Sequence, residues 1–245
     1  MLTLNQTRIS RRVSAWAVHV YTAMGLPLAM CAAVGLVNND IKAFFLWLMA
    51  AVFVDATDGT LARKANVKSV LPEFDGRRLD DIVDFITFAF LPCLALWRFE
   101  ILPPNAEGCC VLPLLASAYG FCQIRAKTDD SFVGFPSYWN ILVLYLVLLA
   151  SPQWLSLVLV VGCSILVFVP IHYVYPTRAP HMQTLTLVGG YLWAAVMVCV
   201  TFYLGESWTQ LVAWCSLAYP FYYLALSYVH HTQIKRRAST DTQTT

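Results

Sequence analysis

Long apolar stretches alternate with short polar breaks along the whole chain. A helix that crosses the hydrocarbon core of a membrane needs about 20 predominantly apolar residues. The pattern predicts an all-α, polytopic membrane bundle of about eight helices, at residues 15–37, 41–62, 79–99, 108–126, 137–151, 153–174, 185–204 and 208–230. Because the stretch at 137–151 is short and the break at 151–153 is narrow, seven or six spans are alternatives to eight.

Basic residues lie mostly on one side of these predicted spans. Counted loop by loop, 14 of the 16 lysine and arginine residues fall on the side of the N-terminus, and Lys42 and Arg98 fall on the other. Lysine and arginine are enriched in cytoplasmic loops. The asymmetry therefore predicts that both termini are cytoplasmic, which requires an even number of spans.

The composition excludes an ordinary soluble domain. Hydrophobic residues make up 59% of the chain and charged residues 12%, with a mean hydropathy of +0.62, whereas soluble domains carry roughly 25% charge. The first apolar run lacks the cleavage site of a signal peptide, so we expect a retained span. A net charge of +2 gives no indication of a nucleic-acid partner. We expect one membrane domain at 1–230 and a basic, then polar, disordered tail at 231–245.

Five aspartates gather at the predicted cytoplasmic ends of the second and third spans. Asp55 and Asp58 close the second span, and Asp80, Asp81 and Asp84 open the third. Acidic residues in a span cost about 2.5–3.5 kcal/mol each and are functional candidates. Residues three or four apart share a helix face, so two neighbouring helices can direct four carboxylates into one cavity. Oxygen ligands without histidine or cysteine favour magnesium, manganese or calcium over zinc.

The surrounding residues allow two interpretations of this acidic group. Gly59 and Ala62 leave room beside Asp58 for a flat nucleotide, and two metal ions about 3.5–4 Å apart can clamp a phosphoryl transfer. Alternatively, the carboxylates pair with neighbouring basic residues as a solvated charge cluster at the helix ends. The basic residues that would serve are Arg63, Arg77 and Arg78.

Two motifs in this region resemble the signature of the CDP-alcohol phosphotransferases. They are DATDGTLAR at residues 55–63 and GRRLDDIVD at residues 76–84, and they match every fixed position of D-x2-D-G-x2-A-R followed by G-x3-D-x3-D. The spacer between them, residues 64–75, is longer than is usual in the superfamily and resembles that of the bacterial phosphatidylcholine synthases. The stretches FVGFPSYWN (132–140) and HYVYPTR (172–178) are also similar to that subfamily.

The resemblance implies a role for each motif position. Asp55, Asp58 and Asp80 would bind Mn²⁺ or Mg²⁺, with two ions expected, and Asp84 would contribute to the metal site and act as general base. The role of Asp81 is left open because it is not a motif position. The nucleotide-binding residues implied by the resemblance are Asp55, Asp58, Gly59, Ala62, Arg63 and Gly76, of which Gly59 and Ala62 would contact the cytidine.

The implied reaction transfers a phosphatidyl group from CDP-diacylglycerol to choline, giving phosphatidylcholine and CMP. The resemblance further implies a multi-pass protein of the bacterial inner membrane, a homodimer, with its active site facing the cytoplasm. Other acceptors are alternatives, namely serine, glycerol 3-phosphate or inositol phosphate. A divalent-ion transporter is a remote alternative, since it would need carboxylates near the bilayer midplane, and a non-catalytic lipid-binding scaffold would not need two metal-spaced pairs.

Residues outside the motifs are candidates for binding the two substrates. Arg125 is a candidate for the lipid phosphate, because a guanidinium binds phosphate oxygens in a bidentate manner. It is equally suited to anchoring a span at the membrane interface. Choline is bound by aromatic faces, although interface belts also contain many aromatic residues. The choline candidates are Tyr138, Trp139, Tyr173 and Tyr175.

Overall fold

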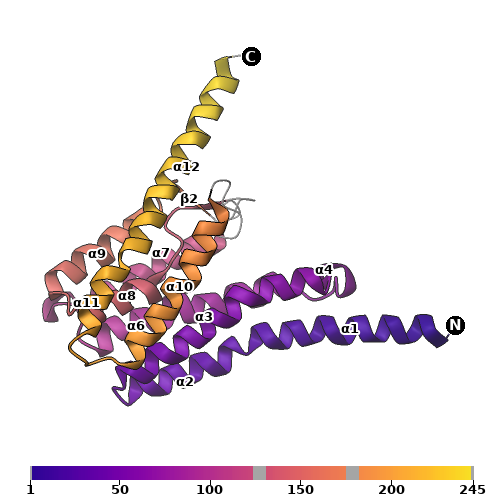
Figure 1. Cartoon of the computed structure of the whole chain (residues 1–245), viewed down its shortest axis with the longest axis horizontal. Helices are drawn as coiled ribbons and strands as arrows, with labels where there is room; N and C mark the ends of the chain where they lie inside the picture. The colour runs from indigo at the N-terminus through magenta and orange to yellow at the C-terminus, as the bar shows by residue number, and fades with distance from the viewer. Residues whose placement is uncertain (1, 124–130, 175–181, 244–245) are drawn as a thin grey trace. The chain divides into compact units, whose positions relative to one another are not determined.

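The computed structural model describes residues 2–123, 131–174 and 182–243 of the chain. These residues are almost entirely helical, which confirms the predicted all-α class (Figure 1). They form two compact units, Met1–Pro92 and Cys93–Thr245. Three helical stretches are long and apolar enough to cross a membrane, namely Arg8–Val37, Ile41–Lys64 and Gln183–Phe202. The chain is therefore an all-α membrane protein.

The first unit holds the helices that bear both acidic motifs. Its first predicted span is divided between α1 and α2 at Met24, and Pro27 accounts for this break because it has no N–H to donate to the carbonyl of Ala23. Asp40 caps the third helix by accepting from the backbone N–H of Ala43 (2.9 Å). The helices of this unit are α1 Leu2–Ala23, α2 Gly25–Val37, α3 Ile41–Lys64, α4 Val67–Val70, α5 Gly76–Asp84 and the π-helix η1 Phe85–Phe90.

The third predicted span is a continuous helical path of three pieces. It begins with α5, continues through η1 and ends with α6, Leu91–Arg98. Asp75 starts it as an N-cap, since its carboxylate accepts from the backbone N–H groups of Arg77 (3.2 Å) and Arg78 (3.3 Å). The cap places Asp80 in the second turn of α5.

The second unit is also helical but includes one short two-stranded antiparallel sheet. Its elements beyond α6 are the 3₁₀ helix η2 Pro104–Cys110, α7 Val111–Cys122, β1 Ser131–Val133, α8 Trp139–Leu148, α9 Gln153–Leu166, β2 His172–Val174, α10 Gln183–Phe202, α11 Thr209–Ser216 and α12 Ala218–Gln243. The predicted span at 208–230 is therefore divided between α11 and α12. The segment 231–245, predicted to be disordered, continues α12 as far as Gln243. No glycine or proline follows His231 to end the helix.

The predicted sixth span, 153–174, is helical only as far as Leu166. Its last residues form β2, which pairs antiparallel with β1 through Ser131–Val174, Phe132–Tyr173 and Val133–His172. Gly134 directly follows β1, adopts a φ of +87° and lies against the carbonyl of Val167, where a Cβ would clash. The two-stranded sheet thus brings together parts of the stretches 132–140 and 172–178, although α8 and α9 separate them in the chain.

Side chains of α12 satisfy the free edge of β2. The N–H of His172 donates to Nδ1 of His231 (3.2 Å), and the N–H of Val174 donates to Oγ of Ser227 (3.2 Å). Tyr223 donates its hydroxyl to the carbonyl of Val174 (3.1 Å). Residues four apart share one helix face, so this face of α12 supplies the hydrogen bonds that a third strand would otherwise make.

His231 makes the attachment of β2 to α12 sensitive to pH. It is buried, lies beyond the predicted span that ends at residue 230, and stacks on His172 at 5.6 Å. Burial, together with Lys235 and His172, lowers the pKa of His231 below its ordinary 6.5. The unfolded chain therefore takes up this proton first, so the stabilisation is complete above pH 6.5 and is lost as the pH falls below it.

We expect His231→Gln to reduce this acid sensitivity. The amide oxygen can accept the same hydrogen bond but does not titrate, whereas a protonated imidazole has no acceptor. Between pH 8 and pH 5.5 the wild type should lose about 1 kcal/mol more stability than the variant, the net value of one hydrogen bond. Unfolding in detergent, followed at both pH values, measures the difference. Equal losses in the two proteins would show that His231 does not titrate in this range.

Candidate metal centre

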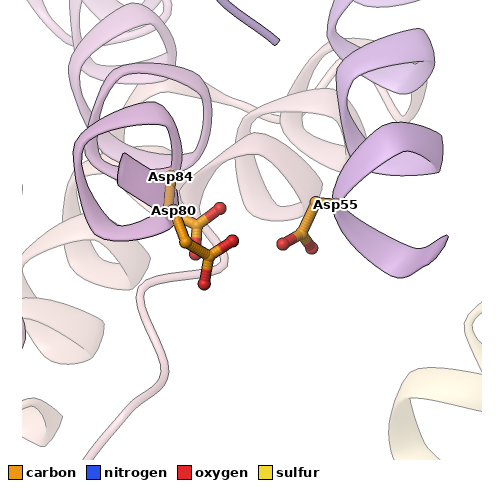
Figure 2. A group of neighbouring side chains, drawn as sticks. All are labelled: Asp55, Asp80 and Asp84. Carbon is orange, nitrogen blue, oxygen red and sulfur yellow. The ribbon is translucent and has the colours of Figure 1, made fainter. Parts of the chain in front are cut away.

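Three aspartates from the two acidic motifs meet in the first unit. Asp55 of α3 and Asp80 and Asp84 of α5 each have a carboxylate oxygen within 4.8 Å of the other two. Figure 2 shows Asp55 facing Asp80 and Asp84 across the space between the two helices. All three side chains are half-buried. Among the residues that the structure describes, this is the one group of such metal-ligand side chains.

Helix geometry explains why Asp80 and Asp84 lie together. They are four residues apart on α5, so they lie one turn above the other on the same face. Asp55 lies in the last three turns of α3, which ends at Lys64. The pairing of positions 80 and 84 was predicted from spacing, whereas the approach of Asp55 depends on how α3 and α5 are arranged.

The donor set and its spacing fit a hard divalent cation. Metal–oxygen distances are about 2.0–2.6 Å for Mg²⁺ and Ca²⁺, so two oxygens on one ion are at most about 4–5 Å apart. Three carboxylates this close repel one another in a partly buried site. A cation bound among them would remove that repulsion, and the group can therefore bind a metal ion.

Asp58 was predicted to join this group but has a different environment. Its carboxyl is buried, 6% exposed, and accepts a hydrogen bond from the hydroxyl of Thr22 on α1. It is not one of the three residues whose oxygens lie within 4.8 Å of one another. Its predicted role as a metal ligand stays a prediction.

Three of the predicted nucleotide residues lie near the C-terminal end of α3, namely Gly59, Ala62 and Arg63. Gly59 is exposed, and a Cβ there would meet only Nη1 of Arg63, at 3.5 Å. Ala62 is half-buried, and Arg63 is exposed and donates to Oγ1 of Thr60 (2.8 Å). Packing therefore does not require glycine at position 59, which leaves close approach of a ligand as a reason for it.

Two of the arginines in the alternative charge-cluster interpretation have other partners. Arg63 is directed to Thr60, and Arg78 forms an ion pair with Asp75 at 3.2 Å. Both Arg78 and Asp75 are largely exposed, so their pair contributes little to stability. These contacts do not include the three clustered carboxylates.

Gly76 is packed tightly where α5 begins. A Cβ at this position would lie 2.6 Å from Cε1 and 3.1 Å from Nδ1 of His19. The His19 ring is itself buried and packs against the rings of Trp16 and Phe74, with centroid distances of 5.7 and 4.4 Å. The glycine thus allows α5 to approach α1, and we expect this packing to set the position of the residues that follow on α5.

We expect Gly76→Ala to displace α5 and impair the site. Overpacking typically costs about 1–3 kcal/mol, and the His19 ring has little room to move. Activity should fall by about 10-fold or more, and the melting temperature should drop. Activity and thermal unfolding of the purified variant test this result.

The double variant Gly76→Ala/His19→Ala supplies the control. Removing the imidazole creates space for the new methyl group, so the double variant should recover part of the activity lost by Gly76→Ala. If the glycine variant is unaffected, or if the double variant is worse than both single variants, the contact is not what restricts α5.

The residues predicted to bind choline and the lipid phosphate are only partly described. Arg125 and Tyr175 lie outside the described residues. Tyr138 is half-buried, Tyr173 is 5% exposed, and Trp139 is fully buried with its indole N–H donating to Oγ of Ser117 (2.7 Å). Each of the three has an aromatic neighbour in the second unit. The pairs are Phe135–Trp139 (5.1 Å), Phe135–Tyr173 (6.5 Å) and Tyr138–Tyr223 (6.5 Å).

Several of these neighbours were not predicted. Thr22, the donor to Asp58, and Tyr223, beside Tyr138, are both far along the chain from the residues they contact. Neither belongs to a motif or to a local spacing pattern that includes its partner. Phe135 lay inside a stretch already identified at 132–140, so an aromatic count over that stretch would have included it.

Comparison with known proteins gives a consistent result. A phosphatidylcholine synthase of Pseudomonas aeruginosa is 37% identical over 194 residues, which cover 78% of this chain and 81% of that protein. A phosphatidylcholine synthase of Legionella pneumophila is 41% identical over 187 residues, covering 74% and 70%. One of Borreliella burgdorferi is 34% identical over 177 residues, covering 71% and 76%. The chain belongs to the phosphatidylcholine synthase family.

This membership confirms the resemblance predicted from the two acidic motifs and the longer spacer. No protein-family model matches the chain. The relatives are bacterial, and the protein is accordingly an enzyme of the phosphatidylcholine synthase family in a helical membrane fold.

Proposed function

We propose that the protein transfers a phosphatidyl group from CDP-diacylglycerol to choline, forming phosphatidylcholine and CMP. The observation that supports this most strongly is the convergence of Asp55, Asp80 and Asp84 in a chain of the phosphatidylcholine synthase family. The resemblance of residues 55–63 and 76–84 to the CDP-alcohol phosphotransferase signature also supports CDP-diacylglycerol as the donor and CMP as the leaving group.

The proposed metal site uses the clustered carboxylates. Asp55, Asp80 and Asp84 would hold Mn²⁺ or Mg²⁺, and Asp58 would complete a site for two ions. When bound, these ions would neutralise the pyrophosphate and stabilise the departing CMP. Gly59 and Ala62 would lie against the cytidine, and Arg63 would bind the nucleotide end.

Asp84 is the proposed general base. As the choline hydroxyl attacks the phosphorus that bears diacylglycerol, its proton passes to the Asp84 carboxylate. A bond forms between the choline oxygen and that phosphorus, and the bond from the phosphorus to the CMP oxygen breaks. Asp84 lies one turn beyond Asp80 on α5, on the side that faces Asp55 (Figure 2).

Choline recognition is assigned to aromatic faces in the second unit. A quaternary ammonium cannot donate a hydrogen bond and is bound by aromatic rings through cation–π interactions. Tyr138, Trp139 and Tyr173 belong to neighbouring aromatic pairs, and Tyr175 follows two residues after Tyr173. Arg125 would bind the lipid phosphate through its guanidinium.

The proposal includes a membrane arrangement. The chain would cross the bacterial inner membrane eight times, as one domain at 1–230, with both termini and the acidic group on the cytoplasmic side. The distribution of lysine and arginine along the sequence supports this orientation. A homodimer is proposed on the resemblance alone.

The test is the release of CMP and the formation of lipid product by the purified protein. CDP-diacylglycerol and Mn²⁺ are supplied with choline, serine, glycerol 3-phosphate or inositol phosphate in parallel reactions. Phosphatidylcholine formed with choline alone supports the proposal. Product with another acceptor would retain the aspartate chemistry and refute the choline assignment. No product with any acceptor, from a folded protein that binds metal, would refute the catalytic role.

A further inference from the structure

Thr22 of α1 contacts the one motif aspartate that lies outside the acidic group. Its hydroxyl donates to the carboxyl of Asp58, and both residues are buried, at 7% and 6% exposed. A hydrogen bond to a buried carboxylate is stronger than one between neutral groups and restricts the orientation of the acceptor. The carboxyl group of Asp58 is therefore held by a residue of another helix.

The residues that directly precede Thr22 and Asp58 make a second side-chain contact between α1 and α3. The hydroxyls of Tyr21 and Thr57 lie 2.8 Å apart, so consecutive residues of α1 meet consecutive residues of α3. Thr57 also lies 2.9 Å and 3.0 Å from the carbonyls of Phe53 and Val54, to which it can donate. Two adjacent side-chain hydrogen bonds fix the level at which α1 lies against this turn of α3.

The same part of the chain also packs on α5. His19 lies against Gly76 at the start of α5, and Gly25, just after α1, lies against the Val83 side chain, where a Cβ would clash. Val83 directly precedes Asp84. The segment from His19 to Gly25 therefore contacts both of the helices that provide acidic residues.

We propose that Thr22 is a positioning residue of the metal site, acting through Asp58. The proposal rests on the proposed function, because it assigns Asp58 to the metal site. The Thr22 hydroxyl and the backbone N–H of Gly59 both donate to the carboxyl group of Asp58. The bond from Thr22 would restrict the rotamer of this carboxyl, and its remaining oxygen lone pairs would accept a cation. Outer partners of this kind orient metal ligands, and their loss typically costs about 10–100-fold in metal affinity.

A purely structural role for Thr22 predicts different behaviour. Loss of the hydrogen bond would then lower stability equally with and without metal, since a buried carboxylate is left with fewer donors. A positioning role also lowers the affinity for the metal. It therefore reduces the additional stability that the metal provides, which depends on concentration and affinity.

The experiment compares Thr22→Val with Thr22→Ser in the purified full-length protein. Valine keeps the shape and removes the hydroxyl, whereas serine keeps the hydroxyl. We expect Mn²⁺ binding, followed by electron paramagnetic resonance, to weaken by about 10-fold in Thr22→Val. Thr22→Ser should stay within about threefold of the wild type. The rise in melting temperature caused by Mn²⁺ should shrink in the valine variant alone.

Thr201→Val is the matched control. Thr201 is a fully buried threonine of α10, and its Oγ1 has no hydrogen-bond partner among the described residues. Its replacement by valine makes the same chemical change as Thr22→Val, the loss of a buried hydroxyl, and leaves the acidic residues unchanged. Mn²⁺ affinity and activity should not change in this variant.

Asp58→Asn completes a double-mutant cycle. If Thr22 acts through Asp58, adding Thr22→Val to Asp58→Asn should cause no further loss of Mn²⁺ affinity. Additive losses would overturn the proposal. Thr22→Ala replaces Thr22→Val in the same comparisons if the valine variant does not fold.

The outcomes separate this inference from the proposed function. Normal Mn²⁺ binding by the wild type and by Thr22→Val alike would overturn the role of Thr22 and leave the function intact. An equal loss in the valine and serine variants would also overturn it, because the hydroxyl would not be the cause. A wild-type protein that binds no Mn²⁺ would overturn the metal site and the inference together.

Discussion

Asp84→Asn is expected to lower the rate of CMP release by about 1,000-fold. The amide cannot accept the proton of the attacking hydroxyl, and loss of a general base typically costs 10²–10⁴-fold. Asparagine has nearly the same shape and retains one oxygen that can face Asp55 and Asp80. Binding of CDP-diacylglycerol should therefore be largely preserved. Single-turnover CMP release and equilibrium binding of the lipid nucleotide measure the two effects separately.

Asp81→Asn is the matched control for this experiment. Asp81 is on the same helix and undergoes the same change of charge, but it is not a member of the clustered group. Its replacement should lower the rate by less than about 10-fold. If Asp84→Asn loses CDP-diacylglycerol binding but releases CMP at the wild-type rate from the substrate that it does bind, the role of Asp84 as base is refuted.

Asp55→Asn is expected to weaken Mn²⁺ binding by at least about 100-fold. Asp55 is the one member of the group on α3, so its replacement removes the only charged ligand that faces Asp80 and Asp84 within that group. A directly binding carboxylate should contribute at least as much as the outer partners of a metal site. Titration of the purified variant with Mn²⁺, with activity measured at each concentration, gives the apparent affinity.

Asp40→Asn controls for the change of charge on α3. Asp40 caps the opposite end of that helix by accepting from the N–H of Ala43, and asparagine is an equally good N-cap. Its Mn²⁺ affinity should match that of the wild type. If Asp55→Asn also binds Mn²⁺ normally, the clustered carboxylates do not form the metal site.

The sequence alone determined the class of protein and which acidic side chains share a helix face. Charge is too scarce for a soluble domain, and this property depends on composition, not on folding. The pairing of Asp80 with Asp84 follows from the period of the α-helix, so spacing predicted it. The resemblance to the phosphatidylcholine synthases rests on two contiguous motifs and was likewise visible in the sequence.

Helix boundaries were predicted less well because local breaks depend on packing as well as composition. The chain from 153 to 174 is predominantly apolar, yet it is helical only to Leu166, and its last residues pair as β2 with the strand Ser131–Val133. The hydrogen-bond partners of β2 on α12 lie more than 50 residues further along the chain. An apolar run indicates that a segment is buried, and burial alone does not distinguish a strand from a helix.

Tertiary structure decided which aspartates meet. Asp55 and Asp58 have the same spacing argument in their favour, but Asp55 faces Asp80 and Asp84 while Asp58 is bound by Thr22. Helix periodicity fixes which side chains share a face and leaves open which other helix lies against that face. That choice comes from contacts between distant segments, here Tyr21 with Thr57 and His19 with Gly76, and no local pattern in the chain encodes them.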